Sequence, residues 1–268
     1  MNKSFINKDK VFLKFNDFQS HRDTVVLIHG LSGSMSGWEK FLKLFNHEFN
    51  IIMIDLRGHG KSFKYTNISD YAIECFSDDI NYVLQHLKID NPIFIAHSFG
   101  CLVLVDYLTR HQPKTGKAIF LSAGFNPKNK AHELLASLFL KVLPNPNYNR
   151  SSSKKYKHLD YSDYPSNKDI EVRRTWADIS NTGLFIFLSC IKHISTLDYR
   201  NKLNLVKIPT LFIHGTSDSI FSHKKMSKIS KSIKGSKMVT IPDANHVMIF
   251  THEQEISKNI LEFIKEDI

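Results

Sequence analysis

The chain has 268 residues, of which 42% are hydrophobic and 23% are charged, and this balance is typical of a globular protein that can bury a core. No apolar run approaches the roughly 20 residues of a membrane span, and the basic N-terminus lacks the apolar segment of a signal peptide, so we expect no membrane span and a cytoplasmic location. The formal net charge is +10, but Lys and Arg are spread along the chain without a nucleic-acid-binding motif, so we expect no nucleic-acid partner.

Short apolar runs alternate with helix-like stretches along most of the chain. Residues 3–15 are expected to form an edge hairpin that turns at Asp9 and Lys10. Strand-like runs then follow at residues 25–30, 50–58, 92–98, 117–124, 209–215 and 237–246, with helical stretches such as 69–87 and 100–111 between them. Continuous apolar runs this short, bounded by Gly, Pro or Asp, are typical of strands buried on both faces. The pattern predicts an α/β fold with a mostly parallel central sheet and helices on both faces.

Residues 126–206 interrupt this alternation. They hold helix-like stretches and a polar aromatic stretch, with no strand-like run. We therefore expect a core domain made of residues 1–125 and 207–268. The helical segment 126–206 is expected to be inserted into this core after the sixth strand.

A possible nucleophile lies where the run at residues 92–98 meets the following helix. Ala96-His97-Ser98-Phe99-Gly100 resembles the small-x-Ser-x-small turn that places a serine between a strand and a helix. Small residues are needed two positions before and after the serine, because larger side chains would strike the neighbouring backbone. The alternative is that Ser98 simply caps the helix at its N-terminus.

A glycine-rich loop, "HGLSGSMSGW", follows the first buried strand at residues 29–38. Such a loop can turn backbone N–H groups into a cleft, as an acyl-transfer enzyme needs for a tetrahedral oxyanion. The two donors would be the N–H of Leu31 and the N–H of Phe99, the residue after the serine. His29 is interpreted as a residue that orients this loop and not as a base.

The loop "DLRGHGKS" at residues 55–62 holds two further titratable side chains. We interpret Asp55 and His59 as structural, because better placed partners for Ser98 exist near the C-terminus. Asp218 follows the run at 209–215, and His246 follows the run at 237–246. A serine needs a base to take its proton, and a histidine needs a carboxylate to hold its tautomer.

Ser98, Asp218 and His246 each come after a different predicted strand. The carboxyl ends of parallel strands share one edge of a sheet, so we expect these three side chains to converge. His214, at the end of its own strand, is expected to pack beside them.

Together, "HGLSGS", "DLRGHGKS", "AHSFG", "HGTSD" and "DANH" resemble the motifs of the α/β-hydrolase superfamily in its lidded form, in family order from residue 25 onward. The resemblance implies that Ser98 is the nucleophile, His246 the base and Asp218 its orienting carboxylate, with Leu31 and Phe99 as oxyanion donors. It also implies that residues 126–206 form the lid. Ala96 departs from the usual glycine. A dehalogenase-like relative would carry aspartate at position 98.

The inserted segment is rich in aromatic side chains that could line a substrate pocket. Trp176 and Phe185 in that segment, together with Trp38 beside the glycine-rich loop, are our candidates for the pocket. The expected substrate is a small-molecule ester, thioester or lactone, and the chain is expected to be a monomer or a homodimer. The resemblance requires no cofactor and no metal. Cys75, Cys101 and Cys190 form no CxxC pair, so neither a disulfide framework nor a zinc site is predicted.

Two other functions remain open on the sequence alone. The same three residues serve proline aminopeptidases, C–C bond hydrolases, cofactor-free haloperoxidases and lyases among lidded relatives. A proline aminopeptidase should offer carboxylates to a substrate amine, and Glu133, Glu171 and Asp178 are available. The third possibility is a non-catalytic ligand receptor on the same fold.

Overall fold

The computed structural model describes residues 2–6, 10–16, 18–45, 48–113, 115–144, 146, 156–164 and 168–266. Within them, eight strands form one sheet in the order β1-β2-β4-β3-β5-β6-β7-β8. The strands are β1 Asn2–Ile6, β2 Val11–Phe15, β3 Thr24–Ile28, β4 Asn50–Asp55, β5 Pro92–His97, β6 Lys117–Leu121, β7 Thr210–Gly215 and β8 Lys237–Ile241.

The sheet is mostly parallel, as the strand–helix alternation predicts. From β4 to β8 all neighbouring strands run parallel, whereas β1 and β2 form an antiparallel pair at one edge. This pair is the expected N-terminal hairpin. Its expected turn residue Asp9 lies outside the described residues.

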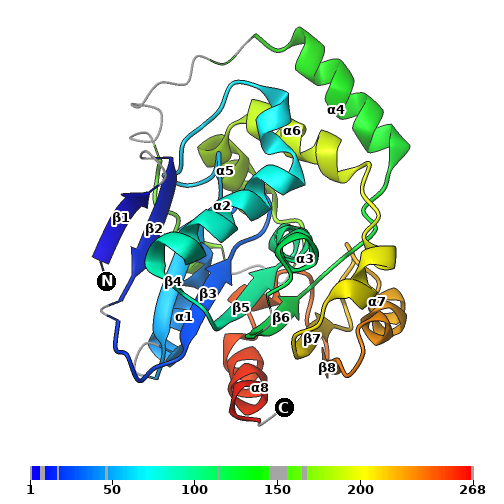
Figure 1. Cartoon of the computed structure of the whole chain (residues 1–268). Helices are drawn as coiled ribbons and strands as arrows, with labels where there is room; N and C mark the ends of the chain where they lie inside the picture. Colours follow the sequence, from blue (N-terminus) through cyan, green and yellow to red (C-terminus); the bar gives the residue numbers. More distant parts are fainter. Residues whose placement is uncertain are drawn as a thin grey trace.

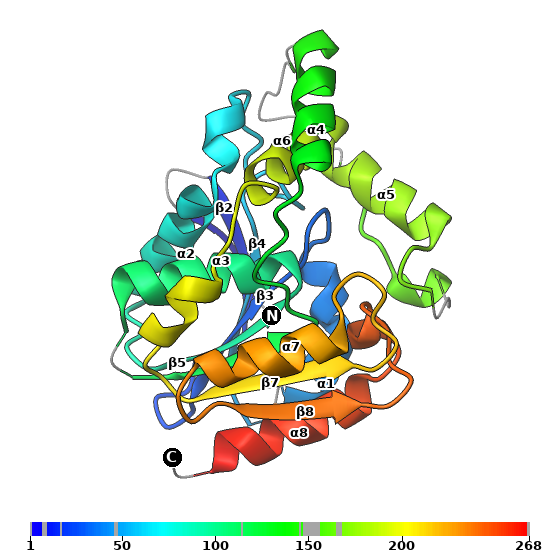
Figure 2. The same ribbon diagram turned by 90° about the vertical axis from the view of Figure 1, so that its right-hand side faces the viewer.

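The central strands are apolar on both faces because both faces are covered by helices. Val26 and Ile28 of β3 point into one core cluster, and Val25 and Leu27 point into the other. The first cluster holds side chains of α2 (Ile73–Leu87), α3 (Phe99–His111) and α7 (His223–Ile229). The second holds side chains of α1 (Glu39–Phe45) and α8 (Glu253–Lys265). Figure 2 shows α7 and α8 on opposite sides of β7 and β8.

The chain between β6 and β7 carries α4 (Lys130–Val142), α5 (Val172–Thr182) and α6 (Leu184–Ile194). These helices gather on one side of the sheet, above it in Figure 1. Gly183 separates α5 from α6 in this segment. Gly183 has φ 99°, a backbone conformation that a residue with a side chain rarely adopts and that no helix can continue through.

Short 3-10 helices complete the described chain: η1 Met35–Trp38, η2 Ile68–Tyr71, η4 Tyr161–Asp163, η5 Arg200–Leu205, η6 Ser230–Ser232 and η7 Met248–Phe250. Every helix among the described residues is too short or too polar to cross a bilayer.

Candidate active site

Ser98 lies at a sharp turn between β5 and α3. Its backbone has φ 51° and ψ −112°, outside the regions that serine normally occupies. Such a conformation costs free energy and persists only where the surroundings hold it in place. Ser98 does not accept a capping hydrogen bond through its side chain, so its hydroxyl is not used as a helix cap.

Two features let the strand and the helix pack this closely at Ser98. A side chain at Gly100 would place its Cβ 2.7 Å from the backbone oxygens of both Ile28 and His29. Ala96 is fully buried, and it pairs with Ile28 of β3 and Phe120 of β6. Its methyl group therefore occupies the core cluster that α2 and α3 cover, and it does not obstruct the turn.

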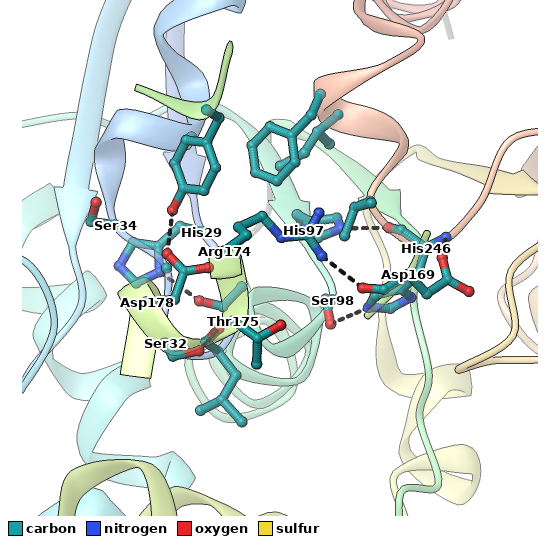
Figure 3. A pocket seen from close by; sticks show the side chains of 18 of the residues that line it. His29, Ser32, Ser34, His97, Ser98, Asp169, Arg174, Thr175, Asp178 and His246 are labelled. Atoms are coloured by element: carbon teal, nitrogen blue, oxygen red, sulfur yellow. Dashed lines mark hydrogen bonds between the residues drawn. The ribbon is translucent and has the colours of Figure 1, made fainter. Parts of the chain in front are cut away.

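The structure brings Ser98, His246 and Asp218 together in one chain of hydrogen bonds (Figure 3 shows the Ser98–His246 contact). Ser98 Oγ lies 2.8 Å from His246 Nε2, and His246 Nδ1 lies 3.0 Å from Asp218 Oδ2. An ionised carboxylate can only accept, so Nδ1 carries the proton and donates it to Asp218. Nε2 is then free to accept the hydrogen bond from the Ser98 hydroxyl.

Asp218 is held as an anion by its surroundings. Burial alone would raise its pKa, but the hydrogen bond and the charge of His246, with the N–H of Phe221, hold that pKa below its ordinary value. Asp218 Oδ1 accepts hydrogen bonds from the N–H groups of Ile220 and Phe221 at 2.9 and 2.8 Å. His214 donates from Nε2 to the Phe221 carbonyl at 2.8 Å, which ties β7 to the same loop.

His97 supports His246 from the opposite side. Its Nε2 donates to the carbonyl oxygen of His246 at 2.9 Å, so the backbone that carries the imidazole is anchored to β5 (Figure 3). Burial, together with the nearby imidazole of His246, lowers the pKa of His97 to about 3. His97 is therefore neutral near pH 7. The sequence, in which His97 simply precedes Ser98, did not allow us to predict that His97 anchors the backbone of His246.

The two expected oxyanion donors lie at the ends of neighbouring strands. Leu31 lines the cavity that holds Ser98, and Phe99 is the first residue of α3, whose N–H has no acceptor within its helix. Within the described part of the chain, neither N–H group has a protein acceptor. Both groups can therefore serve a ligand oxygen.

His29, Asp55 and His59 have structural contacts. His29 Nε2 accepts from the N–H of Leu56 at 3.0 Å, so His29 must donate from Nδ1, and this bond goes to the Gly30 carbonyl at 2.8 Å. Asp55 accepts from the N–H groups of Met35 and Lys61 at 2.9 and 2.8 Å and thereby joins two loops. His59 is fully buried and donates to a carbonyl in its own loop.

A cavity of about 250 Å³ opens above Ser98 and His246. Trp38 lines it. Trp176 and Phe185 do not, and the expectation for these two residues was wrong. Trp176 is 71% exposed on the outer side of α5, whereas Phe185 is buried against the ring of Tyr71, whose centroid lies 6.5 Å away. The sequence of a helical insertion does not show whether an aromatic side chain faces solvent, the core or a ligand.

The three carboxylates that are available to an aminopeptidase in this segment are not gathered in the cavity. Asp178 lines it and accepts a hydrogen bond from the Tyr161 hydroxyl at 2.8 Å. Glu171 instead caps α5 by accepting from two backbone N–H groups, and Glu133, in the first turn of α4, is not among the lining residues. Of these three carboxylates, the structure therefore places only Asp178 in the cavity wall.

Asp169 and Arg174 also line the cavity, and sequence reasoning did not identify either of them. Asp169 accepts from the N–H of His246 at 2.5 Å and from the N–H of Ser219 at 2.7 Å. No motif marks these residues, because their position depends on how the β6–β7 segment folds over the sheet. No cluster of three or more His, Cys, Asp or Glu that could hold a metal ion occurs among the described residues.

A mostly parallel sheet, a serine on a strained strand-to-helix turn and a histidine–aspartate pair beyond later strands define the α/β-hydrolase class. The model of the alpha/beta hydrolase fold family matches residues 23–253. The chain belongs to the α/β-hydrolase family.

Its relatives include enzymes with more than one named activity. A bifunctional esterase/perhydrolase of Acinetobacter calcoaceticus is 24% identical over 96% of this chain and 98% of its own. A non-heme chloroperoxidase of Streptomyces lividans is 24% identical over 90% of this chain and 91% of its own. Among solved structures, a bromoperoxidase from Bacillus anthracis superposes with a TM-score of 0.74 at 24% identity, over 96% of this chain and 95% of that one. These relatives have the same fold but do not define one substrate.

Proposed function

We propose that the protein is a serine hydrolase that cleaves a carboxylic ester, thioester or lactone through an acyl-enzyme. The observation that carries the proposal is the hydrogen-bonded chain from Ser98 Oγ through His246 to Asp218. A serine hydroxyl becomes a useful nucleophile when a base stands within hydrogen-bond distance and a third group orients that base. An esterase among the named relatives is consistent with this chemistry.

In the proposed reaction, Ser98 Oγ attacks the carbonyl carbon while its proton passes to His246 Nε2. Asp218 stabilises the resulting imidazolium and keeps its ring orientation. The N–H groups of Leu31 and Phe99 donate to the tetrahedral oxyanion. The proton on His246 then goes to the leaving group, and water, activated by the same imidazole, hydrolyses the acyl-enzyme.

We further propose that residues 126–206 act as the lid of this site. Their described part contributes Tyr161, Arg174, Asp178 and Phe187 to the cavity wall, opposite Ser98 on the sheet. Substrate selection would then depend on this segment, and the chemistry would depend on the core domain of residues 1–125 and 207–268.

The test is the turnover of p-nitrophenyl esters by wild type and by Ser98→Ala. We expect the substitution to lower kcat by about 10⁴-fold or more, because removing the nucleophile of such a triad leaves only the residual catalysis of binding and oxyanion stabilisation. Ser227→Ala, on α7 away from the cavity, is the matched control and should keep full activity. Unchanged circular dichroism would show that the Ser98→Ala fold persists. Full activity of that variant would refute the proposal.

Perhydrolysis is a second candidate, favoured by the named activity of the Acinetobacter relative. Hydrogen peroxide would replace water in attacking the acyl-enzyme, which would release a peracid and restore the Ser98 hydroxyl. An assay for peracid formed from acetate esters in the presence of hydrogen peroxide, in wild type and Ser98→Ala, tests it directly.

A further inference from the structure

Helix α5 places its side chains in an unusual way. Arg174 is only 5% exposed, whereas Val172 and Trp176 on the same helix are 75% and 71% exposed. Arginine is rarely buried unless an anion pairs with it, and apolar side chains usually take the inner face. Helix α5 therefore buries the charged side chain of Arg174 and leaves the aromatic side chain of Trp176 exposed to solvent.

The contacts of Arg174 leave most of its hydrogen-bonding capacity unused. Nη2 donates to the backbone carbonyl of Asp169 at 2.7 Å, and the guanidinium carbon lies 5.8 Å from the centroid of the Phe250 ring. Among the described residues, no carboxylate forms an ion pair with Arg174. A guanidinium has five N–H donors, so four of them have no acceptor in the described protein.

The nearest carboxylates already have other partners. Asp178, one turn further along α5, accepts from the Tyr161 hydroxyl. Glu171 accepts from the backbone N–H groups of Arg173 and Arg174 at the start of the helix. Asp169 uses its side-chain oxygens for Ser219 and His246. The charge of Arg174 lowers the pKa of Asp178 and of Glu171, but neither carboxylate is in ion-pair contact with the guanidinium. A buried charge without a direct partner is costly, which makes an anion from outside the chain the natural partner.

Arg174 lies in the same cavity as the proposed nucleophile. Both Arg174 and Ser98 line it, and Figure 3 shows the Arg174 side chain extending across the site toward Asp169. The charge of Arg174 is also among the groups that lower the pKa of His97, which directly precedes Ser98. An anion that paired with Arg174 would therefore belong to the molecule that reacts with Ser98.

We propose that the substrate carries a carboxylate, and that Arg174 binds this carboxylate while Ser98 attacks the ester carbonyl of the same molecule. This inference rests on the proposed function, because it names the class of ester that the site accepts. The planar fork of a guanidinium matches the two oxygens of a carboxylate.

A singly charged carboxylate fits better than a phosphate dianion. Asp178 lines the same cavity, and burial raises its pKa to about 6, so this carboxyl is ionised near pH 7. Asp169 adds a second acidic side chain. Repulsion from the carboxylates of Asp169 and Asp178 disfavours a ligand that carries more than one negative charge. The cavity volume of about 250 Å³ fits a short acyl group. The expected substrates are monoesters of short dicarboxylic acids.

The experiment compares two p-nitrophenyl esters with five acyl carbons each, the glutarate monoester and the pentanoate. The first ends in a carboxylate where the second ends in a methyl group. We expect wild type to prefer the glutarate monoester in kcat/KM. In Arg174→Gln, the ratio of KM for the glutarate monoester to KM for the pentanoate should rise about tenfold to hundredfold, the usual effect of losing a hydrogen bond between charged groups.

Two further variants refine this test. Arg173→Gln, an exposed arginine on the same helix, should leave the KM ratio unchanged. Arg174→Lys should restore part of the preference, since lysine keeps the positive charge but lacks the planar two-pronged geometry of the guanidinium.

Equal losses with both esters in Arg174→Gln, or no preference in wild type, would overturn the inference while leaving the esterase proposal intact. A preference for amine-bearing esters that Asp178→Asn removes would overturn it in favour of a cationic substrate.

Binding separates this inference from the hydrolase proposal. Calorimetry on Ser98→Ala should detect binding of glutarate monomethyl ester that the Ser98→Ala, Arg174→Gln double variant lacks. If no ester is turned over by wild type, this difference would still support carboxylate recognition, and the hydrolase proposal alone would fail. Equal binding by both variants would overturn the carboxylate inference.

Discussion

Asp169 links the β6–β7 segment to the imidazole on which the proposed reaction depends. Its carboxylate accepts from the N–H of His246, and it also accepts from both the N–H and the hydroxyl of Ser219, the residue after Asp218. One side chain therefore holds together the two loops that carry His246 and Asp218. Because Asp169 touches neither Ser98 nor the imidazole ring in any hydrogen bond, we assign it a positioning role.

We expect Asp169→Asn to lower kcat for p-nitrophenyl esters about tenfold, with a smaller change in KM. Asparagine has one acceptor oxygen instead of two, so either His246 or Ser219 loses its partner and faces an N–H donor. A lost hydrogen bond to a partly exposed charged group is worth about 1 kcal/mol or slightly more, which corresponds to this factor in rate. Stopped-flow or steady-state kinetics separate kcat from KM.

The matched control is Asp163→Asn, an exposed aspartate in the same segment, which should behave as wild type. The rate at which a fluorophosphonate labels Ser98 should fall in parallel with kcat in Asp169→Asn. Wild-type labelling and wild-type kcat in that variant would show that Asp169 has no positioning role.

At the scale of elements, the site depends on how closely α3 approaches the end of β3. A Cβ at Gly100 would lie 2.7 Å from two backbone oxygens, and neither of these can move without displacing a central strand. Gly37, by contrast, has its nearest neighbour, an atom of the Phe250 ring, 3.5 Å from the position of an added Cβ. A side chain at Gly100 would therefore clash with the backbone, whereas a methyl group at Gly37 would make an ordinary contact.

We expect Gly100→Ala to lower the free energy of unfolding by about 1–3 kcal/mol, the usual cost of overpacking a dense interior. Gly37→Ala should change it by less than about 0.5 kcal/mol, since the added methyl makes an ordinary contact. Urea denaturation of both variants, followed by circular dichroism, measures the difference. Equal stabilities would mean that the backbone at Gly100 relaxes to accept the methyl group.

The sequence was sufficient to predict the elements that place Ser98, Asp218 and His246, because strand ends in a parallel sheet meet at one edge whatever the loops do. This rule does not apply to α5 and α6 of the β6–β7 segment, because each of them follows another helix and not a strand of the sheet. There, the direction in which a side chain points depends on tertiary packing. Trp176 was expected to line the pocket but is exposed to solvent, whereas Arg174, for which the sequence suggested no role, is buried. Helical periodicity could not distinguish them, since α5 buries only Arg174 and Thr182.

At the scale of the whole molecule, several buried imidazoles make the fold sensitive to acid. Burial is the main cause that lowers the pKa of His29 to about 3, of His59 to about 4 and of His97 to about 3. In the unfolded chain, these side chains take up a proton below about pH 6.5. Between about pH 4 and 6.5 the unfolded state therefore binds more protons, and stability falls as the pH falls through this interval.

Two buried carboxyls oppose this trend. Burial raises the pKa of Asp55 and of Asp178 to about 6, so the folded state keeps protons on them that the unfolded state releases above about pH 4. Burial also lowers the pKa of His214 and raises that of Asp79, which adds one group to each side of this balance. Histidines still outnumber carboxyls by one, so the unfolded state keeps a net excess of about one proton near pH 5. The linkage relation converts one proton to about 1.4 kcal/mol per pH unit. We expect the free energy of unfolding to decrease by about that amount between pH 6 and pH 5.

His59 provides the sharpest test of this balance. It is fully buried, and among the described residues its Nε2 has no hydrogen-bond partner. Its Nδ1 donates to the Arg57 carbonyl, and its ring lies near those of Phe76 and Phe99, so replacing the imidazole also changes the absolute stability. His59→Phe and His59→Gln differ in packing and in absolute stability, yet each deletes the same proton from the unfolded state. Both should therefore reduce the pH dependence of urea unfolding between pH 6 and pH 5 by about 1.4 kcal/mol per pH unit. A slope equal to that of wild type in both variants would show that His59 is protonated to the same extent in the folded and unfolded states.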